Sequence, residues 1–599
     1  MTKNPFALEE IKNPAIKWLI RSVSRIDGLE KIYDSWLDEL GERAGGDIAP
    51  DEVDRFTEFC LEQLQVSMEV TGEQSLENIP QTGSAVFVAN HPLGGIEGVM
   101  LTKLLLKFRP DLKVLTNELL SKIPEFKNTF IGVDVLNTDR AHHNARGIRA
   151  VSKHLAGGGA LLVFPAGTVS GIELPSLRLV DRPWSEMITR MARRYDAPVT
   201  PIFVEARNSL FFYLSGFIHK RLRTALLPRA MLEKTGQSVT LHVGETIPSA
   251  DLKRLANDSI AIQYIRFCCQ VLEPSLDSIE ENADTEQAAL RDYPCSEKVS
   301  NHVLGLESYC LLQQERYSLY CAPYSAMGPV MEHLSIIRES TFRTVNEGTG
   351  KELDSDRFDP YYRHLFLWDR EKRQIAGGYR LGNTDKIAEK HGLNGLYSHS
   401  LFDYNKKFLR GLGKTIEVGR SFVATQYQKD PAALDLLWKG IGRYVAQNSQ
   451  YHTLFGCVSI SAEYSNLAKS MLIETFLSHY GVDASITSQV KARSPVKFAP
   501  PPWARDQVAK LSEIPVVNKL VGRIDSGKSI PTLIRHYLAL KGRFVSFSVN
   551  KGFNDSLDGL ILVDLRRTPA RYLKRYLGTN GSKEFIEFHE AEARSSAIV

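Results

Sequence analysis

The stretch Val-Phe-Val-Ala-Asn-His-Pro-Leu-Gly-Gly-Ile-Glu-Gly, residues 86–98, decides what to expect of the first half of the chain. Residues 85–89 are all apolar, which predicts a buried strand, and the glycines behind them predict a tight turn. The turn lies between His91 and Glu97. We therefore expect a histidine just beyond the end of a strand, facing a carboxylate that the turn brings back to it.

Such a pair suits acyl transfer to a hydroxyl group. A neutral imidazole can accept the hydroxyl proton near pH 7, and a carboxylate on its other nitrogen fixes the tautomer and stabilises the imidazolium that forms. Gly94 and Gly95 permit the tight backbone that this geometry needs. We predict His91 and Glu97 as catalytic, with Asn90, Gly94 and Gly95 on the substrate side. Taken alone, the motif fits an ordinary loop histidine equally well.

The flanking sequence has the texture of an α/β domain. Apolar runs at 161–164, 199–204 and 239–243 alternate with helix-length polar or amphipathic segments. Residues 1–70 instead show apolar positions at spacings of three and four, which predicts a helical N-terminal region. We place the first domain at residues 71–272.

Two further blocks accompany the histidine motif. Leu-Leu-Val-Phe-Pro-Ala-Gly-Thr-Val-Ser, residues 161–170, is a strand that enters a Pro/Gly turn, and Ala-Pro-Val-Thr-Pro-Ile-Phe-Val, residues 197–204, is a strand with prolines at its start. In this order the three blocks resemble those of the glycerolipid acyltransferase superfamily, over roughly residues 70–255. The resemblance implies a glycerolipid-acyltransferase-like fold, and it places Pro165, Gly167 and Thr168 at the substrate.

The departures from that pattern point to the acceptor. Glu97 replaces an Asp one position earlier, a variant similar to a hemolysin-like branch of the superfamily. Ala166 and Val169 stand where the superfamily has a Glu and an Arg that bind glycerol phosphate. Without that charge and planar fork, we expect an acceptor such as a hydroxyl on a lipid acyl chain. Arg140 and Arg146 are candidate head-group contacts, although both are equally well read as surface arginines.

A second α/β region follows an acidic segment. Residues 273–299 are polar, acidic and poor in large apolar side chains, which predicts an interdomain linker. Residues 300–570 form the second domain, and 571–599 a charged tail. The expected strands are 365–368, 374–379, 415–423, 453–460, 544–549 and 559–565, with helices at 432–446 and 466–480.

Polar residues interrupt the apolar strand 415–423, Thr-Ile-Glu-Val-Gly-Arg-Ser-Phe-Val. The strand–helix–strand order resembles a GNAT-type transferase, and E-x-G-R-S together with residues 527–540 and 558–565 resembles the ornithine N-acyltransferases over about 310–567. The resemblance implies Glu417 as a catalytic base, Arg420 as a partner for a carboxylate or phosphate, and Ser421 as a donor to developing charge. The alternative is an ion pair of Glu417 and Arg420 on the strand surface.

The acyl donor is suggested by the loop at 424–430. It lacks the glycine-rich turn that usually cradles the pyrophosphate of coenzyme A, so acyl carrier protein is the favoured donor and acyl-CoA the alternative. Lys and Arg residues between 505 and 543 are candidates to meet the acidic carrier protein. No resident cofactor and no metal site is predicted.

Residues 522–529, Gly-Arg-Ile-Asp-Ser-Gly-Lys-Ser, match the P-loop pattern, but their context argues against a nucleotide site. A P-loop follows a strong strand, whereas residues 515–521 are short and carry Asn518 and Lys519. Pro531 would fall in the first turn of the helix that the loop should begin. We therefore read Lys528 as a basic residue on the donor side.

The bulk numbers narrow the setting. The formal net charge is +4 with dispersed Lys and Arg, which does not argue for nucleic acid, and seven scattered cysteines fit reduced thiols in the cytoplasm. No signal peptide or spanning segment is evident. The apolar stretch 209–218, followed by basic residues, fits either a membrane-surface contact or a core segment. We expect a peripheral enzyme on the inner face of the bacterial cytoplasmic membrane.

Together the two halves resemble the bifunctional ornithine lipid synthases. The implied order runs from the second domain, which N-acylates ornithine with a 3-hydroxyacyl chain, to the first, which O-acylates that 3-hydroxyl. Backbone amides around Gly94–Gly95 or Gly167–Thr168 are the candidate oxyanion donors. Glycine, lysine or glutamine head groups remain open. The alternatives are a phospholipid-remodelling acyltransferase with a non-catalytic second half, and a membrane-active hemolysin.

Overall fold

The structure is a computed structural model, and it divides into two compact units, residues 1–275 and 276–599, which we describe separately. It describes residues 4–7, 13–42, 52–117, 120–133, 141–173, 178–218, 223, 225–274, 287–498, 501, 503, 505–508, 510–511 and 513–597.

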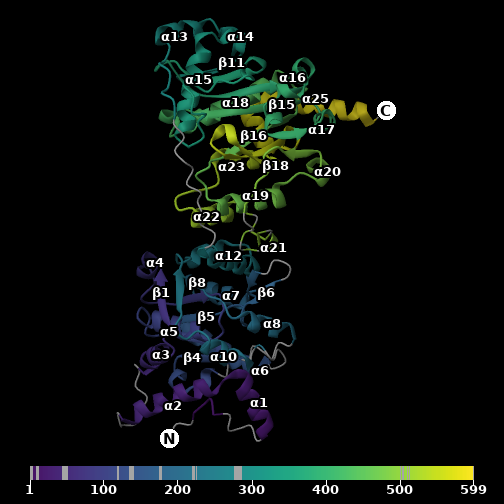
Figure 1. The fold of residues 1–599 in the computed structure, drawn as a ribbon. Coiled ribbons are helices and arrows are strands. Elements are labelled where there is room, and N and C mark those ends of the chain that lie inside the picture. The colour runs from purple at the N-terminus through teal and green to yellow at the C-terminus, as the bar shows by residue number, and fades with distance from the viewer. Residues whose placement is uncertain are drawn as a thin grey trace. The chain divides into compact units, whose positions relative to one another are not determined.

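Unit 1 is built on a mixed sheet in the order β1-β9-β8-β2-β5-β3-β4 (Figure 1). All neighbouring strands in it are parallel except β8 and β9, which are antiparallel. Its strands are β1 (Ser67–Thr71), β2 (Ala85–Ala89), β3 (Lys113–Asn117), β4 (Phe130–Val133), β5 (Ala160–Val163), β8 (Val199–Glu205) and β9 (Ser238–Val243), beside a hairpin of β6 (Gly171–Glu173) and β7 (Arg178–Val180). The strands expected at 85–89, 161–164, 199–204 and 239–243 are thereby confirmed.

Helices cover both faces of this sheet. The helices are α1 (Pro14–Ser24), α2 (Asp27–Glu42), α3 (Glu52–Gln63), α4 (Glu73–Glu77), α5 (Ile96–Leu106), α6 (Ala141–Ala156), α7 (Met187–Arg194), α8 (Leu210–Ile218), α10 (Leu227–Leu232), α11 (Ser249–Arg254) and α12 (Asp258–Gln270). Phe87 and Ala89 of β2 face a core shared with α3 and α5, while α12 packs on β8 and on α7. Because successive strand residues alternate between faces, His91 continues the series toward α5.

The N-terminal region is not purely helical, because β1 lies within it and pairs with β9 along its whole length. The sequence does not predict this strand, because the side chains of Ser67–Thr71 alternate between exposed and half-buried and form no apolar run.

Unit 2 holds a sheet in the order β10-β11-β12-β13-β15-β16-β19-β18. The strands of this unit are β10 (Cys310–Gln314), β11 (Tyr317–Pro323), β12 (Arg363–Asp369), β13 (Gln374–Asn383), β14 (Phe402–Tyr404), β15 (Thr415–Val423), β16 (Thr453–Ile460), β17 (Val490–Ala492), β18 (Arg543–Asn550) and β19 (Ser556–Asp564). The strands expected at 365–368, 374–379, 415–423, 453–460, 544–549 and 559–565 are confirmed, and β10 and β11 were not anticipated.

The sheet opens between β15 and β16. These two strands are parallel and pair only through Thr415–Glu417 and Thr453–Phe455, after which each continues without the other. On its other edge β16 pairs with β19 along its whole length. The opening leaves an edge of β15 unpaired next to β16, and this is where the pocket of unit 2 lies.

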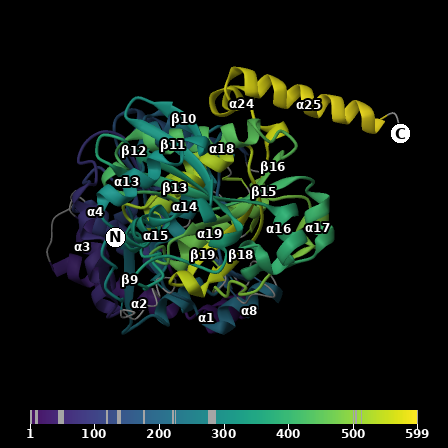
Figure 2. The ribbon, with the colours of Figure 1, turned by 90° about the horizontal axis from the view of Figure 1, so that it is seen from above.

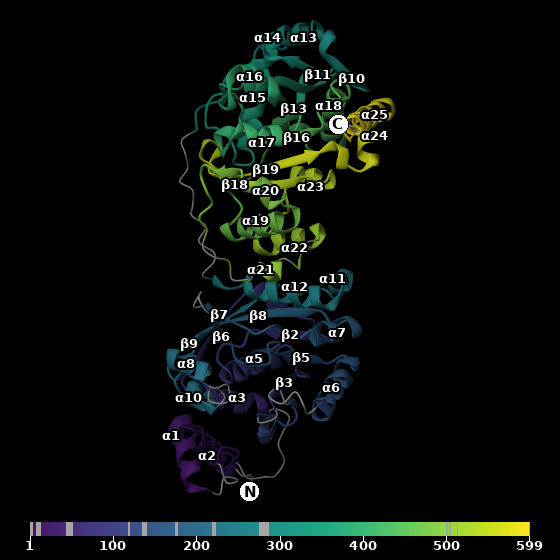
Figure 3. The ribbon, with the colours of Figure 1, turned by 90° about the vertical axis from the view of Figure 1, so that its right-hand side faces the viewer.

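Helices surround this second sheet (Figure 3). They are α13 (Ser296–Leu304), α14 (Tyr324–Met327), α15 (Pro329–Arg343), α16 (Thr384–His391), α17 (Lys406–Gly411), α18 (Pro431–Ala446), α19 (Asn466–Tyr480), α20 (Ala484–Thr487), α21 (Arg505–Val508), α22 (Ile514–Ile524), α23 (Thr532–Ala539), α24 (Ala570–Leu577) and α25 (Thr579–Ala597). The helices expected at 432–446 and 466–480 are α18 and α19. The segment read as linker up to residue 299 already contains the first turn of α13.

One expectation fails in unit 2, and the rejection of the P-loop pattern is confirmed. Residues 571–599 were read as a charged tail, but α24 packs on α18 and buries Leu573, Tyr576 and Leu577, and α25 extends from it in Figure 2. The charges hide an amphipathic pattern in which apolar residues recur on one face. The P-loop pattern is also excluded structurally: Gly522 lies inside α22, and the Lys528 ammonium group bonds the backbone carbonyl of Glu463.

No helix among the described residues is long and apolar enough to cross a membrane. The stretch 209–218 forms α8, which has two unlike faces. Phe212 and Tyr213 are buried, whereas Leu210, Phe211 and Leu214 are each more than half exposed. One face of α8 therefore packs in the core, as the core reading expects, and the membrane-surface reading of the other face stays a prediction.

Candidate active sites

In unit 1 the structure brings His91 and Glu97 together. The Nδ1 atom of His91 lies 2.9 Å from Oε1 of Glu97, whose side chain is fully buried while that of His91 is partly exposed. Glu97 sits in the first turn of α5, where the partial positive charge of a helix N-terminus favours a carboxylate. Nε2 of the imidazole is left as the nitrogen that can take a proton from a substrate.

The turn between them is built around the carboxylate. The backbone N–H groups of Leu93 and Gly94 donate to Oε1 of Glu97 at 2.9 and 2.6 Å, and that of Gly95 donates to Oε2 at 3.0 Å. Gly94 has a φ of +95°, and a Cβ atom there would collide with the side chains of Leu227 and Val169. Glycine is therefore required at 94 for both conformation and space.

These bonds fix the protonation state of Glu97. Burial by itself would raise the pKa of this carboxyl group, but the charge and hydrogen bond of His91 and the backbone bond from Gly94 hold the pKa below its usual value. Glu97 is thus an anion at neutral pH. The same bonds occupy the amides of Gly94 and Gly95, so these two cannot serve as the oxyanion donors expected from the sequence.

Asn90 holds a strand rather than a substrate. Its Nδ2 atom donates to the carbonyl of Val204 at 3.1 Å, and its Oδ1 atom accepts from the amide of Val204 at 2.6 Å. This pair extends the β2–β8 ladder by one step through a side chain. The prediction that Asn90 lies on the substrate side gives way to a positioning role, because both polar atoms are used.

The second sequence block closes over the histidine. The amide of Ser170 donates to the carbonyl of His91 at 2.8 Å, and the ring of Phe164 lies 4.5 Å from the imidazole. Pro165 is buried, and the amide of Gly167 donates within its own turn to Phe164. Thr168 keeps a buried hydroxyl with no hydrogen-bond partner among the described residues. Of this block, Thr168 is the side chain free to contact a substrate.

Two residues of this site were missed from the sequence. Asn208 is buried and donates to the carbonyls of Pro92 and Leu93 at 3.0 and 3.1 Å, so it clamps the turn that carries the carboxylate. Arg223 donates to the carbonyl of Val169 at 3.0 Å. A guanidinium group therefore stands beside the position where the superfamily pattern has its arginine. The only sequence signal was its place among basic residues after α8.

Of the two arginines predicted from the sequence, the structure describes only Arg146. Arg140 lies outside the described residues, and Arg146 is exposed on α6. Burial lowers the pKa of Arg223, and the positive charge of Arg182 lowers it further. Two like charges close together form a region that favours an anion.

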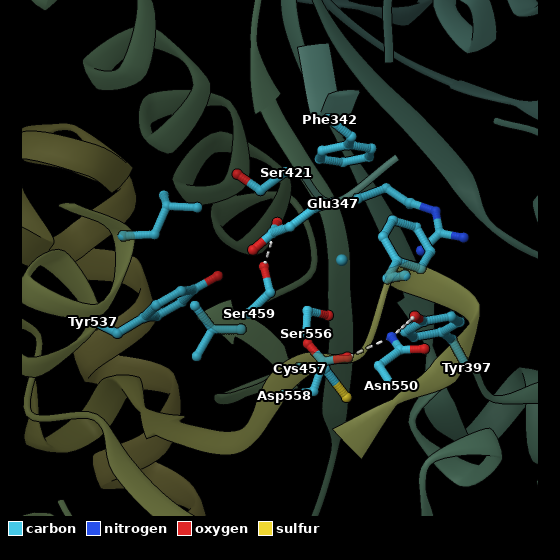
Figure 4. Close-up of a pocket in the computed structure, with 15 residues that line it drawn as sticks. Phe342, Glu347, Tyr397, Ser421, Cys457, Ser459, Tyr537, Asn550, Ser556 and Asp558 are labelled. Atoms are coloured by element: carbon cyan, nitrogen blue, oxygen red, sulfur yellow. Dashed lines mark hydrogen bonds between the residues drawn. The ribbon is translucent and has the colours of Figure 1, made fainter. Parts of the chain in front are cut away.

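In unit 2 a pocket lies in the opening of the sheet (Figure 4). Gly419, Arg420 and Ser421 line it from β15, Cys457, Val458 and Ser459 from β16, and Ser556 and Asp558 from β19. Glu347, Tyr397, Asn550 and Leu533 are among the remaining lining residues. An opened sheet of this kind leaves strand backbone with which an extended molecule can pair.

Arg420 is held by a buried ion network. It has a φ of +49° at a register shift between β13 and β15, and its guanidinium group bonds Asp354 and Asp356 at 3.0 Å. Burial would lower the pKa of Arg420, but the carboxylates, Asp354 foremost, raise it. The guanidinium group of Arg420 is therefore held in place, and its charge is already paired.

Glu417 does not line this pocket. It is fully buried on β15, and its carboxylate accepts hydrogen bonds from the Tyr362 hydroxyl and from the amides of Tyr397 and Ser398. Burial raises the pKa of Glu417, although these hydrogen bonds act to lower it. The structure therefore gives Glu417 the place of a residue that fixes the segment of Tyr397, and it brings Arg420 and Ser421, but not Glu417, to the pocket.

Two other carboxyl groups face the pocket instead. Glu347 accepts a hydrogen bond from the Ser459 hydroxyl at 2.8 Å, and Asp558 accepts one from Asn550, as Figure 4 shows. Burial raises the pKa of Glu347 to about 7 and that of Asp558 to about 6. Sequence reasoning missed both, because Glu347 lies in an irregular segment far from the strands that form the opening.

Comparisons with known families match the two units separately. A family described as an acyltransferase matches residues 41–279, and a family described as an acetyltransferase (GNAT) domain matches residues 337–439. The first match contains the His91–Glu97 pair, and the second contains β12–β15 and the start of α18.

Individual relatives fall into the same two kinds. The chain is 30% identical over 218 residues to a lyso-glycine lipid O-acyltransferase of Phocaeicola vulgatus, covering 35% of this chain and 75% of the relative. It is 28% identical over 261 residues to a glycine N(alpha)-acyltransferase of the same species, covering 41% and 79%. An L-ornithine N(alpha)-acyltransferase of Rhodobacter capsulatus is 25% identical over 273 residues, covering 44% and 88%.

Proposed function

We propose a two-step synthesis of an amino-acid lipid, starting from the premise that this chain belongs to the acyltransferase family of the Phocaeicola vulgatus lyso-glycine lipid O-acyltransferase and carries a GNAT-like acyltransferase domain behind it. Unit 2 transfers a 3-hydroxyacyl chain to the α-amine of an amino acid. Unit 1 then esterifies the 3-hydroxyl of that product with a second acyl chain.

One observation supports this proposal: a single chain holds a histidine–carboxylate pair in unit 1 and a pocket lined by carboxyl groups in unit 2. The His91–Glu97 pair is built to activate a hydroxyl, and the pocket of unit 2 presents carboxyl groups suited to an ammonium. Joining both steps in one chain raises the local concentration of the intermediate at the second site.

The chemistry of the first site follows from its geometry. Nε2 of His91 takes the proton of the acceptor hydroxyl while the oxygen attacks the acyl thioester, and Glu97 stabilises the imidazolium. His91 then gives the proton to the departing thiolate. Ala166 and Val169 leave the usual glycerol phosphate contacts unmade, which supports a lipid hydroxyl as acceptor.

For the amino acid we propose ornithine. The pocket holds two carboxyl groups, those of Glu347 and Asp558. Ornithine can place an ammonium group on each of them, whereas glycine has only one ammonium group. The relatives support both choices, since their names include glycine and L-ornithine N(alpha)-acyltransferases. A competition assay with equimolar ornithine, glycine, lysine and glutamine measures the preference, and glycine in the major product would overturn it.

For the donor we propose acyl carrier protein. Helix α23 supplies Leu533 to the pocket and carries exposed Arg535, and Lys541 and Arg543 follow it on the surface. An acidic carrier protein would meet these charges at the mouth of the pocket. Arg535→Glu is expected to raise KM for acyl carrier protein and to leave KM for acyl-CoA unchanged; equal effects on both donors contradict the proposal.

We further propose that unit 1 works on the inner face of the cytoplasmic membrane. The exposed side of α8, with Leu210, Phe211 and Leu214, and Trp18 of α1 offer apolar side chains to a bilayer. Replacing the three α8 residues by Ser is expected to weaken binding to anionic phospholipid vesicles in a flotation assay, whereas Leu304→Ser, also an exposed leucine, serves as the control.

The complete proposal is tested by expressing the chain in a bacterium that lacks amino-acid lipids. Mass spectra of its lipids should show a new ninhydrin-positive lipid with two acyl chains. His91→Ala should convert this to the one-chain intermediate. Exchange of phospholipid acyl chains without any ninhydrin-positive product would instead identify a phospholipid-remodelling enzyme.

A further inference from the structure

The pocket of unit 2 contains few groups that can take a proton. Among the described residues that line it, Arg420 is a paired cation, and burial raises the pKa of Cys457, Tyr397 and Tyr537 so that they stay protonated. No histidine is among these lining residues. Two carboxyl groups remain, those of Glu347 and Asp558.

The sheet itself brings these two groups together. Ser459 of β16 and Asp558 of β19 are direct cross-strand partners, so their side chains point to the same face. Ser459 also donates its hydroxyl hydrogen to Glu347. Glu347 and Asp558 are thus both adjacent to Ser459, at the edge where β16 separates from β15 (Figure 4).

Glu347 is held rigidly although it lies in no helix or strand. It follows α15, and its amide donates to the carbonyl of Phe342 at 2.9 Å. The preceding residues are tied down by Ser461, which donates to Val345, and by Asn554, which donates to both oxygens of Asn346. Anchors from two other segments for one short loop are typical of a side chain whose position matters.

We infer that Glu347 is the catalytic proton acceptor for amine acylation, with Asp558 the second carboxylate that holds the substrate ammonium. This rests on the proposed function of unit 2. It moves the role expected of Glu417 to a carboxyl group that faces the pocket.

Amine acylation at this site moves one proton to Glu347 and one to the leaving sulfur. The α-ammonium group gives one proton to the Glu347 carboxylate and becomes a free amine. Its nitrogen attacks the thioester carbonyl, the C–N bond forms, and the C–S bond breaks. The nitrogen gives a second proton to the leaving thiolate, which departs as a thiol, and Glu347 returns its proton to water. The net products are an amide, a thiol and one proton.

The surroundings tune Glu347 for this task. Asp558 from β19 and Glu463 from the segment after β16 face it with negative charge, while Ser459 donates a hydrogen bond. Arg420 of β15 lies in the same pocket but is compensated by Asp354 and Asp356. A base that is half protonated near the working pH transfers protons efficiently in both directions.

The test uses the full chain with 3-hydroxyacyl carrier protein and ornithine. Thiol release and N-acyl-ornithine are followed from pH 5.5 to 9. The wild type should lose kcat/KM at acidic pH, with a midpoint near 7. Glu347→Gln should reduce kcat about 10²–10⁴-fold and abolish that acidic limb. Glu371→Gln, the same change at an exposed turn, should match the wild type.

A second variant separates the role of Glu347 from folding. Ser459→Ala removes the bond that lowers the pKa of Glu347, so the acidic limb of this variant should move to higher pH. Wild-type rate and limb in Glu347→Gln would overturn the inference while the proposed function stands. A wild type that acylates no amine overturns both.

Discussion

In the proposed reactions the two sites prepare their nucleophiles in opposite ways. In unit 1 a partly exposed histidine is backed by a fully buried carboxylate, whereas in unit 2 buried carboxyl groups face the pocket themselves. A hydroxyl is a weak acid, so it needs a base whose positive charge is stabilised as it forms. An ammonium group already carries a removable proton, and a carboxylate near neutral pKa is enough. The difference in base follows from the difference in acceptor.

The two carboxylates also differ in how they are satisfied. Glu97 receives three backbone N–H groups and a histidine, and its pKa is lowered despite complete burial. Glu347 receives one hydroxyl, and burial raises its pKa to about 7. The charge of His91 together with the backbone donors keeps Glu97 an anion, whereas one hydroxyl donor does not offset the burial of Glu347.

The largest effect is expected from His91→Ala. The imidazole is the proposed acceptor of the hydroxyl proton, so its removal should lower O-acylation about 10³–10⁴-fold. N-acylation by unit 2 should be unchanged, and the one-chain lipid should accumulate. Thin-layer separation of labelled lipids measures both products. If N-acylation fell in parallel, the two sites would not be independent and the comparison would fail.

The next largest effect is expected from Glu97→Gln. The amide keeps one acceptor oxygen for four donors, so the imidazole loses its orientation, and O-acylation should fall about 10²–10³-fold. Because the folded-state pKa of Glu97 is lowered, its stabilising effect is present above its usual pKa and lost as pH falls. The difference in unfolding free energy between wild type and variant should therefore shrink below about pH 4. A difference independent of pH would contradict the ionised state given to Glu97.

Glu347→Gln should do the reverse and stabilise unit 2 at alkaline pH. The pKa of Glu347 is raised in the folded state, so its favourable contribution is complete below pH 4.5 and is lost as pH rises through about 7. At pH 8 the glutamine variant should be more stable than the wild type by about 3 kcal/mol, and at pH 4 the two should be equal. Denaturant unfolding at both pH values measures this. Equal stability at pH 8 would mean that the carboxylate is better solvated than the structure shows.

How far the sequence predicted these sites depends on how local each one is. His91, Gly94 and Glu97 fall within one turn, so spacing alone was enough to pair them. Asn208 reaches this turn from after β8, Arg223 reaches Val169 of the second block from after α8, and nothing in their local sequence marks them. Tertiary packing places these two residues at the site, and a sequence pattern does not reveal such packing.

In unit 2 the same limit explains the choice of Glu417. The motif E-x-G-R-S drew attention to the carboxylate inside the strand, but β15 turns that side chain toward Tyr362 and away from the pocket. Glu347 precedes the motif by a long stretch of chain, and it reaches the pocket beside Ser459 of β16. The central strands followed from their apolar runs and the two unit folds from the family resemblances, whereas the pairing of Glu347 with Ser459 required the folded sheet.

The smallest effect is expected at Arg223. Because the guanidinium group bonds the carbonyl of Val169, it supplies a positive charge beside a turn whose own arginine is absent. The carboxylate of a one-chain amino-acid lipid is an anion suited to that charge. Arg223→Ala should therefore raise KM for this lipid about tenfold, which corresponds to about 1.4 kcal/mol, with kcat nearly unchanged. Arg254→Ala, at a largely exposed arginine of the same unit, is the matched control. A lyso-lipid methylated at its carboxylate should bind wild type and Arg223→Ala with the same KM. If its KM still differed between the two, Arg223 would act on the turn and not on the lipid head group.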